Sequence, residues 1–412
     1  MSDDHDHRQL AQRFDLFHFQ EEAPGMVFWH PKGLVLYRLL ESAVRSHTES
    51  EGYAEVRTPL IMRRPVWEAS GHWEHFRESM FRVDDDEHEA AVKPVSCPGH
   101  VYIAERRNPS YRDLPLRFAE FGTVHRDEPS GTLQGLLRLR QFTQDDGHVF
   151  CMPEQAEGEV ERFCRAVMPF YAAFGFDRVA VVLSTRPEHR AGDDASWDHA
   201  ERALSSVAPR LGWDVTVQPG GGAFYGPKLE FVLADRLRRK WQCGTIQFDL
   251  VMPERFGLRY VGRSGAREPL VMLHRALYGS LERFLAIVLE HHGGDLPEWL
   301  SPQQVRVLPV AGDHVAWAER VERTLRDGGL RAAMDRRSET LSRRIAEAHA
   351  DGVPLVVIVG ARETANETVT LRSRDGQSVA SLEQALVELK RRTMSPFSRH
   401  DSASPEKMSA TG

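Results

Sequence analysis

A run of polar side chains along one expected strand is the most informative chemical pattern of the 412-residue chain. The segment 117–150 reads as two strands joined by a turn-rich loop at 127–135, with Asp, Pro, Ser, Thr and Gly. Side chains alternate between the two faces of a strand. One face of the second strand therefore carries Arg138, Arg140, Phe142, Gln144, Asp146 and His148.

This face differs from that of an ordinary core strand, which buries apolar side chains. It holds two guanidinium groups, an amide, a carboxylate and an imidazole, and burying such groups without partners is costly. We expect the face to meet a polar and anionic partner, and Arg126, at the end of the first strand, to point the same way. The alternative interpretation is a solvated strand face with salt bridges.

The segment Lys93–His100 (KPVSCPGH) reads as a tight loop that opens a helix, with Pro98 in the first turn. A cysteine just before a helix N-terminus is expected to have a lowered thiol pKa, which suits a nucleophile or a metal ligand. No Cys–His pair has the local spacing of a zinc finger, so a zinc site would have to be assembled from distant segments. His72, between a glycine and a tryptophan, is by pattern alone typical of a packed histidine.

A glycine-rich segment at 220–231 (GGGAFYGPKLEF) has the glycine separation of a phosphate loop. Pro227 stands where such a loop needs lysine, and no serine or threonine follows, so we reject that interpretation. We expect a hairpin whose glycines let a substrate approach the backbone. The strand at 241–250 carries a polar set that could line a pocket: Cys243, Thr245, Gln247 and Asp249. Ser280 is a plausible N-cap of the last helix of this region, and Arg283 lies in its first turn, where the helix dipole disfavours a cation unless an anion is near.

These segments resemble the motifs of the class II aminoacyl-tRNA synthetases in their threonyl form. FGTVHRDEPSG followed by LRLRQFTQDDGHVF resembles motif 2, and GSLERF resembles motif 3. The helix at 33–50 and the Pro-bearing strand at 53–62 resemble motif 1, the dimerisation element. The similarity extends from about residue 7 to about residue 390. It implies an α+β fold: an antiparallel-sheet catalytic domain followed by a small α/β anticodon-binding domain.

The resemblance also assigns roles to site residues. The implied zinc ligands, which leave one coordination position open, are Cys97, His148 and His274. The implied threonine-binding residues are Asp146, Gln144, Tyr225, Lys228 and Gln247. The implied ATP-binding residues are Arg126, Glu128, Arg138 and Arg283. The implied catalytic residues are Arg126, Arg283 and His72, the last of them near the threonine and the tRNA ribose.

The implied reaction is the ATP-dependent activation of L-threonine to threonyl-adenylate and its transfer to the 3′ end of threonine tRNA. One Zn²⁺ per subunit would select threonine, and Mg²⁺ would accompany ATP. A site that demands a hydroxyl rejects valine strongly and serine weakly. Two alternatives remain: a threonine-activating enzyme with a non-tRNA acceptor such as a carrier protein, and a non-catalytic tRNA-binding paralogue.

The pattern predicts a catalytic core at 1–296, a linker at 297–303, an anticodon-binding domain at 304–393 and a disordered tail at 394–412. Glu363 and Arg372 match positions that read the anticodon in the family. The net charge of −7 means that any nucleic-acid contact comes from local patches. Four cysteines without regular spacing, no signal peptide and no apolar run of membrane-spanning length indicate a cytoplasmic protein with free thiols. Motif 1 implies a homodimer.

Two departures from the family are visible. Full-length bacterial members carry an N-terminal editing region, whereas this chain begins at the catalytic core, so we expect seryl-tRNA to form without being cleared. In the second domain, the basic residues usual before the third strand are here Asp351 and Gly352, and the family's Arg-Asn-Glu-Lys is here Arg337–Thr340. Fewer cations should weaken the attraction to tRNA phosphates.

Overall fold

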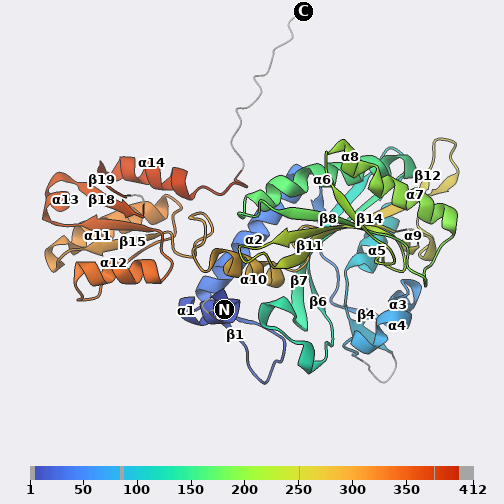
Figure 1. The fold of residues 1–412 in the computed structure, drawn as a ribbon, viewed down its shortest axis with the longest axis horizontal. Coiled ribbons are helices and arrows are strands. Elements are labelled where there is room, and N and C mark those ends of the chain that lie inside the picture. The colour runs from blue at the N-terminus through green and yellow to red at the C-terminus, as the bar shows by residue number, and fades with distance from the viewer. Residues whose placement is uncertain (1–4, 84–87, 250, 375, 399–412) are drawn as a thin grey trace, which may run out of the picture. The chain divides into compact units, whose positions relative to one another are not determined.

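A computed structural model of the chain describes residues 5–83, 88–249, 251–374 and 376–398. The chain forms two compact units, whose elements are labelled in Figure 1. The first contains the residues up to Glu41 and Glu51–Leu296, and the second contains Ser42–Ser50 and the residues from Pro297 onward. Within the described ranges, no helix is long and apolar enough to cross a membrane. Most of the expected tail, residues 399–412, lies outside the described residues.

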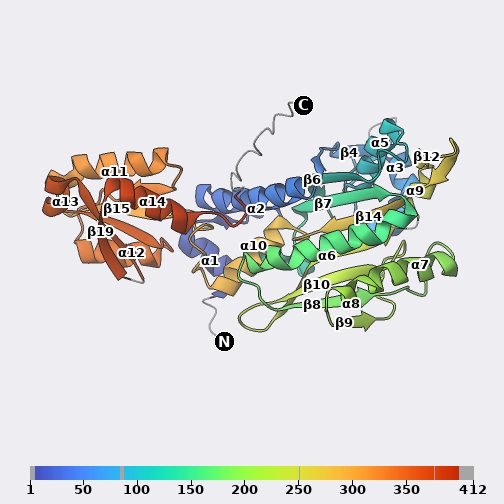
Figure 2. The same ribbon diagram turned by 90° about the horizontal axis from the view of Figure 1, so that it is seen from above.

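An eight-stranded, mostly antiparallel sheet forms the centre of the first unit (Figure 2). Its order is β3 (Ala54–Glu55), β6 (Leu116–His125), β7 (Gln141–Cys151), β14 (Val271–Ala276), β11 (Lys240–Asp249), β10 (Lys228–Ala234), β8 (Val179–Ser184) and β9 (Val215–Gln218). Only the outermost pairs, β3 with β6 and β8 with β9, are parallel. The predicted antiparallel catalytic sheet is therefore confirmed.

Helices cover both faces of this sheet. On one face lies α5 (Cys97–Arg107), whose His100 contacts His148 of β7. On the other face lie α6 (Ala156–Ala172) and α10 (Leu281–His292), which meet where the rings of Tyr171 and Phe284 pack 6.5 Å apart. The odd-numbered residues of β7 face this second layer, since the carboxylate of Asp145 accepts hydrogen bonds from backbone N–H groups just before α10.

Further elements complete the first unit. They are α1 (His7–Phe14), β1 (Phe17–His18), β2 (Phe28–Trp29), α2 (Pro31–Ser50), β4 (Ile61–Arg63), α3 (Arg64–Ala69), α4 (His72–Phe76), β5 (Ala90–Val92), α7 (Asp194–Ser205), α8 (Val207–Arg210), α9 (Met252–Arg255), β12 (Arg259–Val261) and β13 (Arg267–Pro269), except that Ser42–Ser50 at the end of α2 belong to the second unit. The single strand predicted at 53–62 is wrong. β3 pairs with β6, whereas β4 pairs with β5 in a separate sheet, because Pro59 between them has no N–H to donate to a ladder.

The second unit is a five-stranded mixed sheet with helices on both faces. Its order is β16 (Ala332–Met334), β15 (Val305–Pro309), β17 (Leu355–Val359), β18 (Thr368–Ser373) and β19 (Gly376–Ser381). β15 is parallel to both of its neighbours, and the other pairs are antiparallel. The helices are α11 (Val315–Asp327), α12 (Leu341–Ala350), α13 (Ala361–Asn366) and α14 (Leu382–Thr393). The predicted small α/β domain of mixed sheet is confirmed, and β19 is an additional strand.

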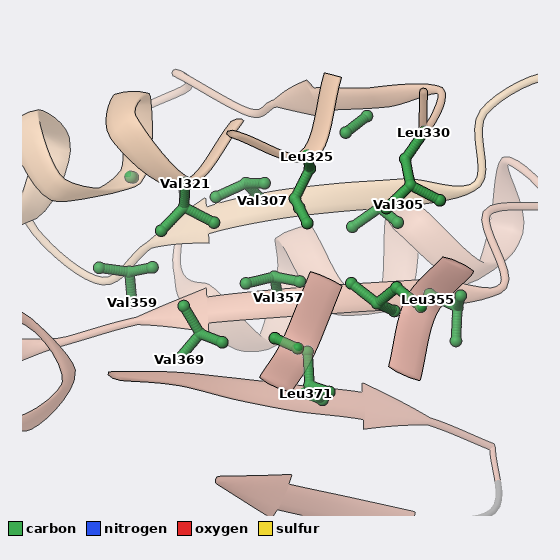
Figure 3. Close-up of a cluster of buried hydrophobic side chains, with 14 of the residues drawn as sticks. Val305, Val307, Val321, Leu325, Leu330, Leu355, Val357, Val359, Val369 and Leu371 are labelled. Atoms are coloured by element: carbon green, nitrogen blue, oxygen red, sulfur yellow. The ribbon is translucent and has the colours of Figure 1, made fainter. Parts of the chain in front are cut away.

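The core of the second unit follows from strand alternation. Val307 of β15 and Val357 of β17 point toward Val321 and Leu325 of α11 (Figure 3). Val356, the residue before Val357 in β17, lies in a second cluster on the opposite face together with residues of α12. Near-continuous apolar strands are therefore buried on both sides, as parallel strands require.

Candidate active site and metal centre

A cavity of about 490 Å³ opens in the first unit on the α5 side of the sheet. Its walls come from β7, β11 and β14, from the start of α5, from α4 and from the first turn of α10. Among the residues predicted for the site, those that line it are His72, Cys97, Arg126, Glu128, Arg138, Gln144, Asp146, His148, Tyr225, Gln247, His274 and Arg283. Segments far apart in the sequence thus supply one polar cavity.

Cys97, His148 and His274 meet at the floor of this cavity. His148 and His274 are directly opposite each other on the paired strands β7 and β14, and Cys97 is the first residue of α5. One ligand atom from each residue lies within 4.8 Å of the other two. All three side chains are buried, with 5%, 0% and 8% of their surfaces exposed.

The protonation of the two imidazoles favours a cation between them. His274 Nε2 lies 2.8 Å from a carboxylate oxygen of Asp249, to which it donates its proton, so its Nδ1 lone pair is free. That Nδ1 faces Nε2 of His148 at 2.9 Å. Burial holds the pKa of His148 well below its usual value, which disfavours a shared proton. A metal ion accepts both lone pairs, and one thiolate with two imidazoles is a typical zinc donor set.

The expected lowering of the Cys97 thiol pKa is wrong. Burial, and then the charges of Asp146 and Asp249, raise it well above its usual value. A thiol of this kind is a poor nucleophile, because the thiolate is the reactive form. A bound metal ion deprotonates a coordinating thiol outright, so the ligand role is compatible with the burial.

Asp146 stands next to this trio. Its carboxylate lies 3.6 Å from His148 Nε2, and its side chain is 15% exposed toward the cavity. Across the cavity, the Tyr225 hydroxyl donates to Gln247 Oε1 at 2.8 Å, and the Tyr225 ring lies 5.3 Å from that of His274. An acceptor, a hydroxyl and an amide therefore surround the space beside the metal ligands.

Arg126 presents an unpaired guanidinium to the cavity. Its Nε donates to the carbonyl of Pro94 at 3.3 Å, and its Cζ lies 5.2 Å from the ring centroid of Phe142. Among the described residues, neither Nη atom has a hydrogen-bond partner. Burial lowers the pKa of Arg126, but an arginine side chain stays charged in proteins. A cation that is partly buried and has no ion-pair partner among the described residues calls for an anionic ligand.

The other residues predicted to bind ATP also line the cavity. Arg138 donates to Glu128 through Nη2 at 2.7 Å and Nε at 3.1 Å. Ser280 caps α10 through its hydroxyl, which accepts from the Arg283 backbone N–H, as predicted. The Arg283 guanidinium donates to the carbonyl of Leu137 at 3.2 Å. Arg283 is thus held in the first helical turn at the cavity wall.

His72 lies deep in the cavity wall at the start of α4. Its Nδ1 is 2.8 Å from the Ser70 hydroxyl, and its ring packs edge-on against Trp67. Burial lowers the pKa of His72 to about 4, so the ring is neutral at physiological pH. The pattern alone suggested a packed histidine, and the structure shows one that is packed and also lines the cavity.

Lys228 is the member of the predicted threonine-binding set that does not line this cavity. Its ammonium pairs with Glu230 at 2.9 Å. The interpretation of the preceding glycines also needs correction: they pack against the protein's own backbone. A Cβ on Gly226 would lie 1.6 Å from the carbonyl oxygen of Phe248, and one on Gly222 would lie 2.7 Å from that of Thr185.

In the second unit, the Glu363 carboxylate is held by hydrogen bonds within the protein, whereas the Arg372 side chain is exposed to solvent. Glu363 caps α13: one carboxylate oxygen accepts from the Gly360 N–H at 2.9 Å and the other from the Thr370 hydroxyl at 2.8 Å. These hydrogen bonds outweigh burial and lower its pKa. Arg372 is exposed on β18 and borders a cavity of about 260 Å³ with Arg392.

Sequence reasoning placed Asp249 in a polar set that could line a pocket, but it missed that residue's contact with His274 and the roles of several other buried polar residues. Asp249 binds His274, and Asp145 accepts from three successive N–H groups at 277–279. Glu282 accepts from the Thr143 N–H of β7. His100 contacts His148. The face of β7 that carries Asp145 also carries Gln141 and Thr143, so the strand pattern offered no clear signal for Asp145, and contacts between distant elements leave none either.

Comparisons with known proteins agree with this geometry. The model of the tRNA synthetase class II core domain (G, H, P, S and T) matches residues 81–292, and that of an anticodon binding domain matches residues 304–392. The threonine–tRNA ligase of Burkholderia mallei (strain SAVP1) is 47% identical over 393 residues, which are 95% of this chain and 62% of the relative. That of Nitrosomonas europaea is 48% identical over 92% of this chain and 59% of its own length. The chain thus spans about three fifths of the length of these relatives.

Solved structures show the same likeness. The crystal structure of the RNA binding domain of threonyl-tRNA synthetase from Cryptosporidium parvum Iowa II is similar, with a TM-score of 0.90 and 40% identity over 94% of this chain and 98% of that one. Giardia lamblia prolyl-tRNA synthetase, 16% identical with a TM-score of 0.70, shares the fold alone. The chain belongs to the class II aminoacyl-tRNA synthetase family, and within it to the threonyl-tRNA synthetases.

Proposed function

We propose that the chain activates L-threonine with ATP and transfers the threonyl group to the 3′ end of threonine tRNA. The observation that carries this proposal is the convergence of two imidazole lone pairs and a thiol beside Asp146, with the unpaired cation of Arg126 in the same cavity. The relatives named threonine–tRNA ligase support the choice of amino acid and acceptor.

Selection of threonine follows from this donor set. Zinc held by Cys97, His148 and His274 would supply a Lewis acid with an open position for an amino group and a vicinal hydroxyl. Asp146 accepts a hydrogen bond from the same hydroxyl. Valine has nearly the shape of threonine but no hydroxyl, so it leaves the carboxylate unpaired, which is strongly unfavourable. Serine keeps both groups and is rejected weakly.

The first chemical step joins the amino acid to AMP. A carboxylate oxygen of threonine attacks the α-phosphorus of ATP, the bond from that phosphorus to its bridging oxygen breaks, and pyrophosphate leaves. Arg126 stabilises the charge on the α-phosphate, and Arg283 holds the γ-phosphate end; Mg²⁺ with ATP would neutralise further charge. The protein contributes position and electrostatics without a nucleophile.

The Glu128–Arg138 pair orients the adenine end of ATP. Because the two side chains already bind each other, they present a fixed edge to the nucleotide. In the second step a ribose hydroxyl of the tRNA attacks the carbonyl carbon of the adenylate, and AMP leaves. Neutral His72 is an acceptor for that hydroxyl at the cavity wall. Arg372 contributes to anticodon contact, whereas the engaged carboxylate of Glu363 has less freedom to do so.

We also propose that two copies of the chain pair through α2 and the strand that follows it, as motif 1 implies. Light scattering of the purified chain tests this proposal, since a monomeric mass at micromolar concentration would contradict it.

Two assays test the proposed function. ATP–pyrophosphate exchange should depend on threonine, fall steeply with valine and persist with serine. Charging of unmodified threonine tRNA transcript should follow. Exchange without charging would indicate a different acceptor, and neither activity with threonine would refute the proposal.

A further inference from the structure

A network of buried polar side chains leads away from the metal trio into the protein interior; it consists of His100, Glu120, Lys93 and Thr58. His148 Nδ1 lies 2.7 Å from His100 Nδ1, and His100 Nε2 lies 3.1 Å from a carboxylate oxygen of Glu120. The other oxygen of that carboxylate accepts from the Lys93 ammonium at 2.9 Å. Thr58 adds its backbone N–H at 3.0 Å and its hydroxyl at 2.8 Å.

Stability alone does not account for this network of buried polar side chains. Lys93, Glu120 and His100 are 1%, 3% and 0% exposed. Removing two charges from water has a desolvation penalty that their attraction repays poorly, and apolar residues of similar volume often do as well or better. His100 neither belongs to the metal trio nor lines the cavity. The network can therefore act on the site only through the contact of His100 with His148.

The network determines which ring nitrogen of His100 and of His148 carries a proton. Burial raises the pKa of Glu120, but hydrogen bonds from His100, Lys93 and Thr58 outweigh it and lower the pKa to about 2. An ionised carboxylate only accepts hydrogen bonds, so His100 carries its proton on Nε2. In that tautomer Nδ1 of His100 is an acceptor, so His148 donates to it from its own Nδ1 across 2.7 Å. The remaining lone pair of His148, on Nε2, faces His274 and Cys97.

We propose that His100 is a positioning residue that fixes the tautomer and the ring orientation of His148 for metal binding, with Glu120 and Lys93 holding His100 in turn. The proposal rests on the metal site of the proposed function. Asp249 does the same for His274 directly, through one carboxylate. His274 is thus oriented by one carboxylate, whereas His148 is oriented by a histidine that is itself held by a carboxylate. Loss of a partner of this type typically lowers metal affinity by about 10- to 100-fold.

A pair of substitutions at position 100 separates this role from simple packing. In His100→Asn, an amide oxygen occupies the place of Nδ1 and can still accept from His148, but the contact with Glu120 is lost. In His100→Gln, the amide reaches toward Glu120, but no acceptor faces His148. His100→Phe removes both. His292→Gln is a matched control, since His292 is a partly buried histidine bonded to the Phe174 carbonyl, away from the trio.

The test is zinc affinity of the full chain, measured by competition with a chromophoric chelator, with the visible spectrum of the cobalt-substituted protein as a second readout. His100→Gln and His100→Phe should bind zinc about 10- to 100-fold more weakly than the wild type, whereas His100→Asn and His292→Gln should remain within about threefold. The thiolate-to-cobalt band should persist in all four variants, and the ligand-field bands should change only in His100→Gln and His100→Phe. If His100→Phe does not fold, the Asn and Gln variants carry the comparison.

Two results would overturn the inference alone: wild-type affinity in His100→Gln, or equal weakening in His100→Asn and His100→Gln. A wild-type chain that binds no stoichiometric zinc would instead refute the metal site itself, and the inference with it.

Discussion

Glu282→Gln should stabilise the first unit at alkaline pH. Glu282 lies in the first turn of α10 and is 4% exposed. Both of its oxygens accept from the Thr143 N–H at 3.0 Å, and one also accepts from the Ser280 hydroxyl at 2.8 Å. Among the described residues, no cation pairs with it. Burial raises its pKa from 4.5 to about 7, with the backbone hydrogen bonds opposing and the charge of Glu41 adding to the rise.

The sign and size of the effect follow from these values. A carboxyl whose pKa is higher in the folded than in the unfolded protein holds its proton more tightly when folded. Its contribution is fully present below pH 4.5 and is lost as the pH rises through 7. The loss amounts to about 3 kcal/mol, since each pKa unit corresponds to about 1.4 kcal/mol. Glutamine keeps an acceptor for Thr143 and cannot ionise, so it avoids this loss.

Urea unfolding of the wild type and Glu282→Gln from pH 5 to pH 8.5 measures the difference. The free energies of unfolding should differ little at pH 5 and should diverge between pH 5 and pH 7, with the variant more stable by about 3 kcal/mol above pH 7. Glu290→Gln in the same helix is the control of opposite sign. His7 and other partners outweigh burial and lower the pKa of Glu290, so its contribution is present above pH 4.5 and lost as the pH falls. A difference between wild type and Glu282→Gln that does not vary with pH would refute this reasoning.

Three further predictions concern the cavity and its supports. Arg126→Gln should lower threonine-dependent pyrophosphate exchange by about 100-fold or more without lowering the free energy of unfolding, because it removes a partly buried cation that has no ion-pair partner among the described residues; a large loss of stability would contradict this. Lys93→Met should destabilise the chain by about 3–5 kcal/mol in urea unfolding, because Glu120 is left buried without its cation. Adding Glu120→Gln should restore most of that loss. Gly226→Ala should unfold at a markedly lower temperature in calorimetry, because its Cβ would meet the Phe248 carbonyl oxygen at 1.6 Å.

Strand alternation predicted the polar face of β7 well. Gln144, Asp146 and His148 line the cavity as the period of two requires. The same alternation fails at Arg140, because β7 begins at Gln141 and the chain before it turns. The Arg140 guanidinium instead donates to the backbone carbonyl of Glu128 at 2.8 Å. Local pattern is thus reliable within a strand and unreliable at its end.

The buried partners of the site could not be read from the sequence. His100 lies on α5, and it contacts both Glu120 of β6 and His148 of β7 only when the helix packs on the sheet. The predicted lowering of the Cys97 thiol pKa was wrong for a related reason: the helix dipole acts locally, whereas the burial that outweighs it comes from packing. Apart from Lys228, the residues that the resemblance assigned to the catalytic site line the cavity, while the supporting groups behind them required the fold.

X-ray absorption at the zinc edge tests the central claim most directly. The account predicts a stoichiometric zinc ion bound by one sulfur at about 2.3 Å and by two imidazole nitrogens at about 2.0–2.1 Å. Addition of threonine should change the remaining nitrogen and oxygen ligands, and addition of valine should not. Absence of zinc, a zinc shell without sulfur, or an unchanged spectrum with threonine would contradict the proposed metal-based selection.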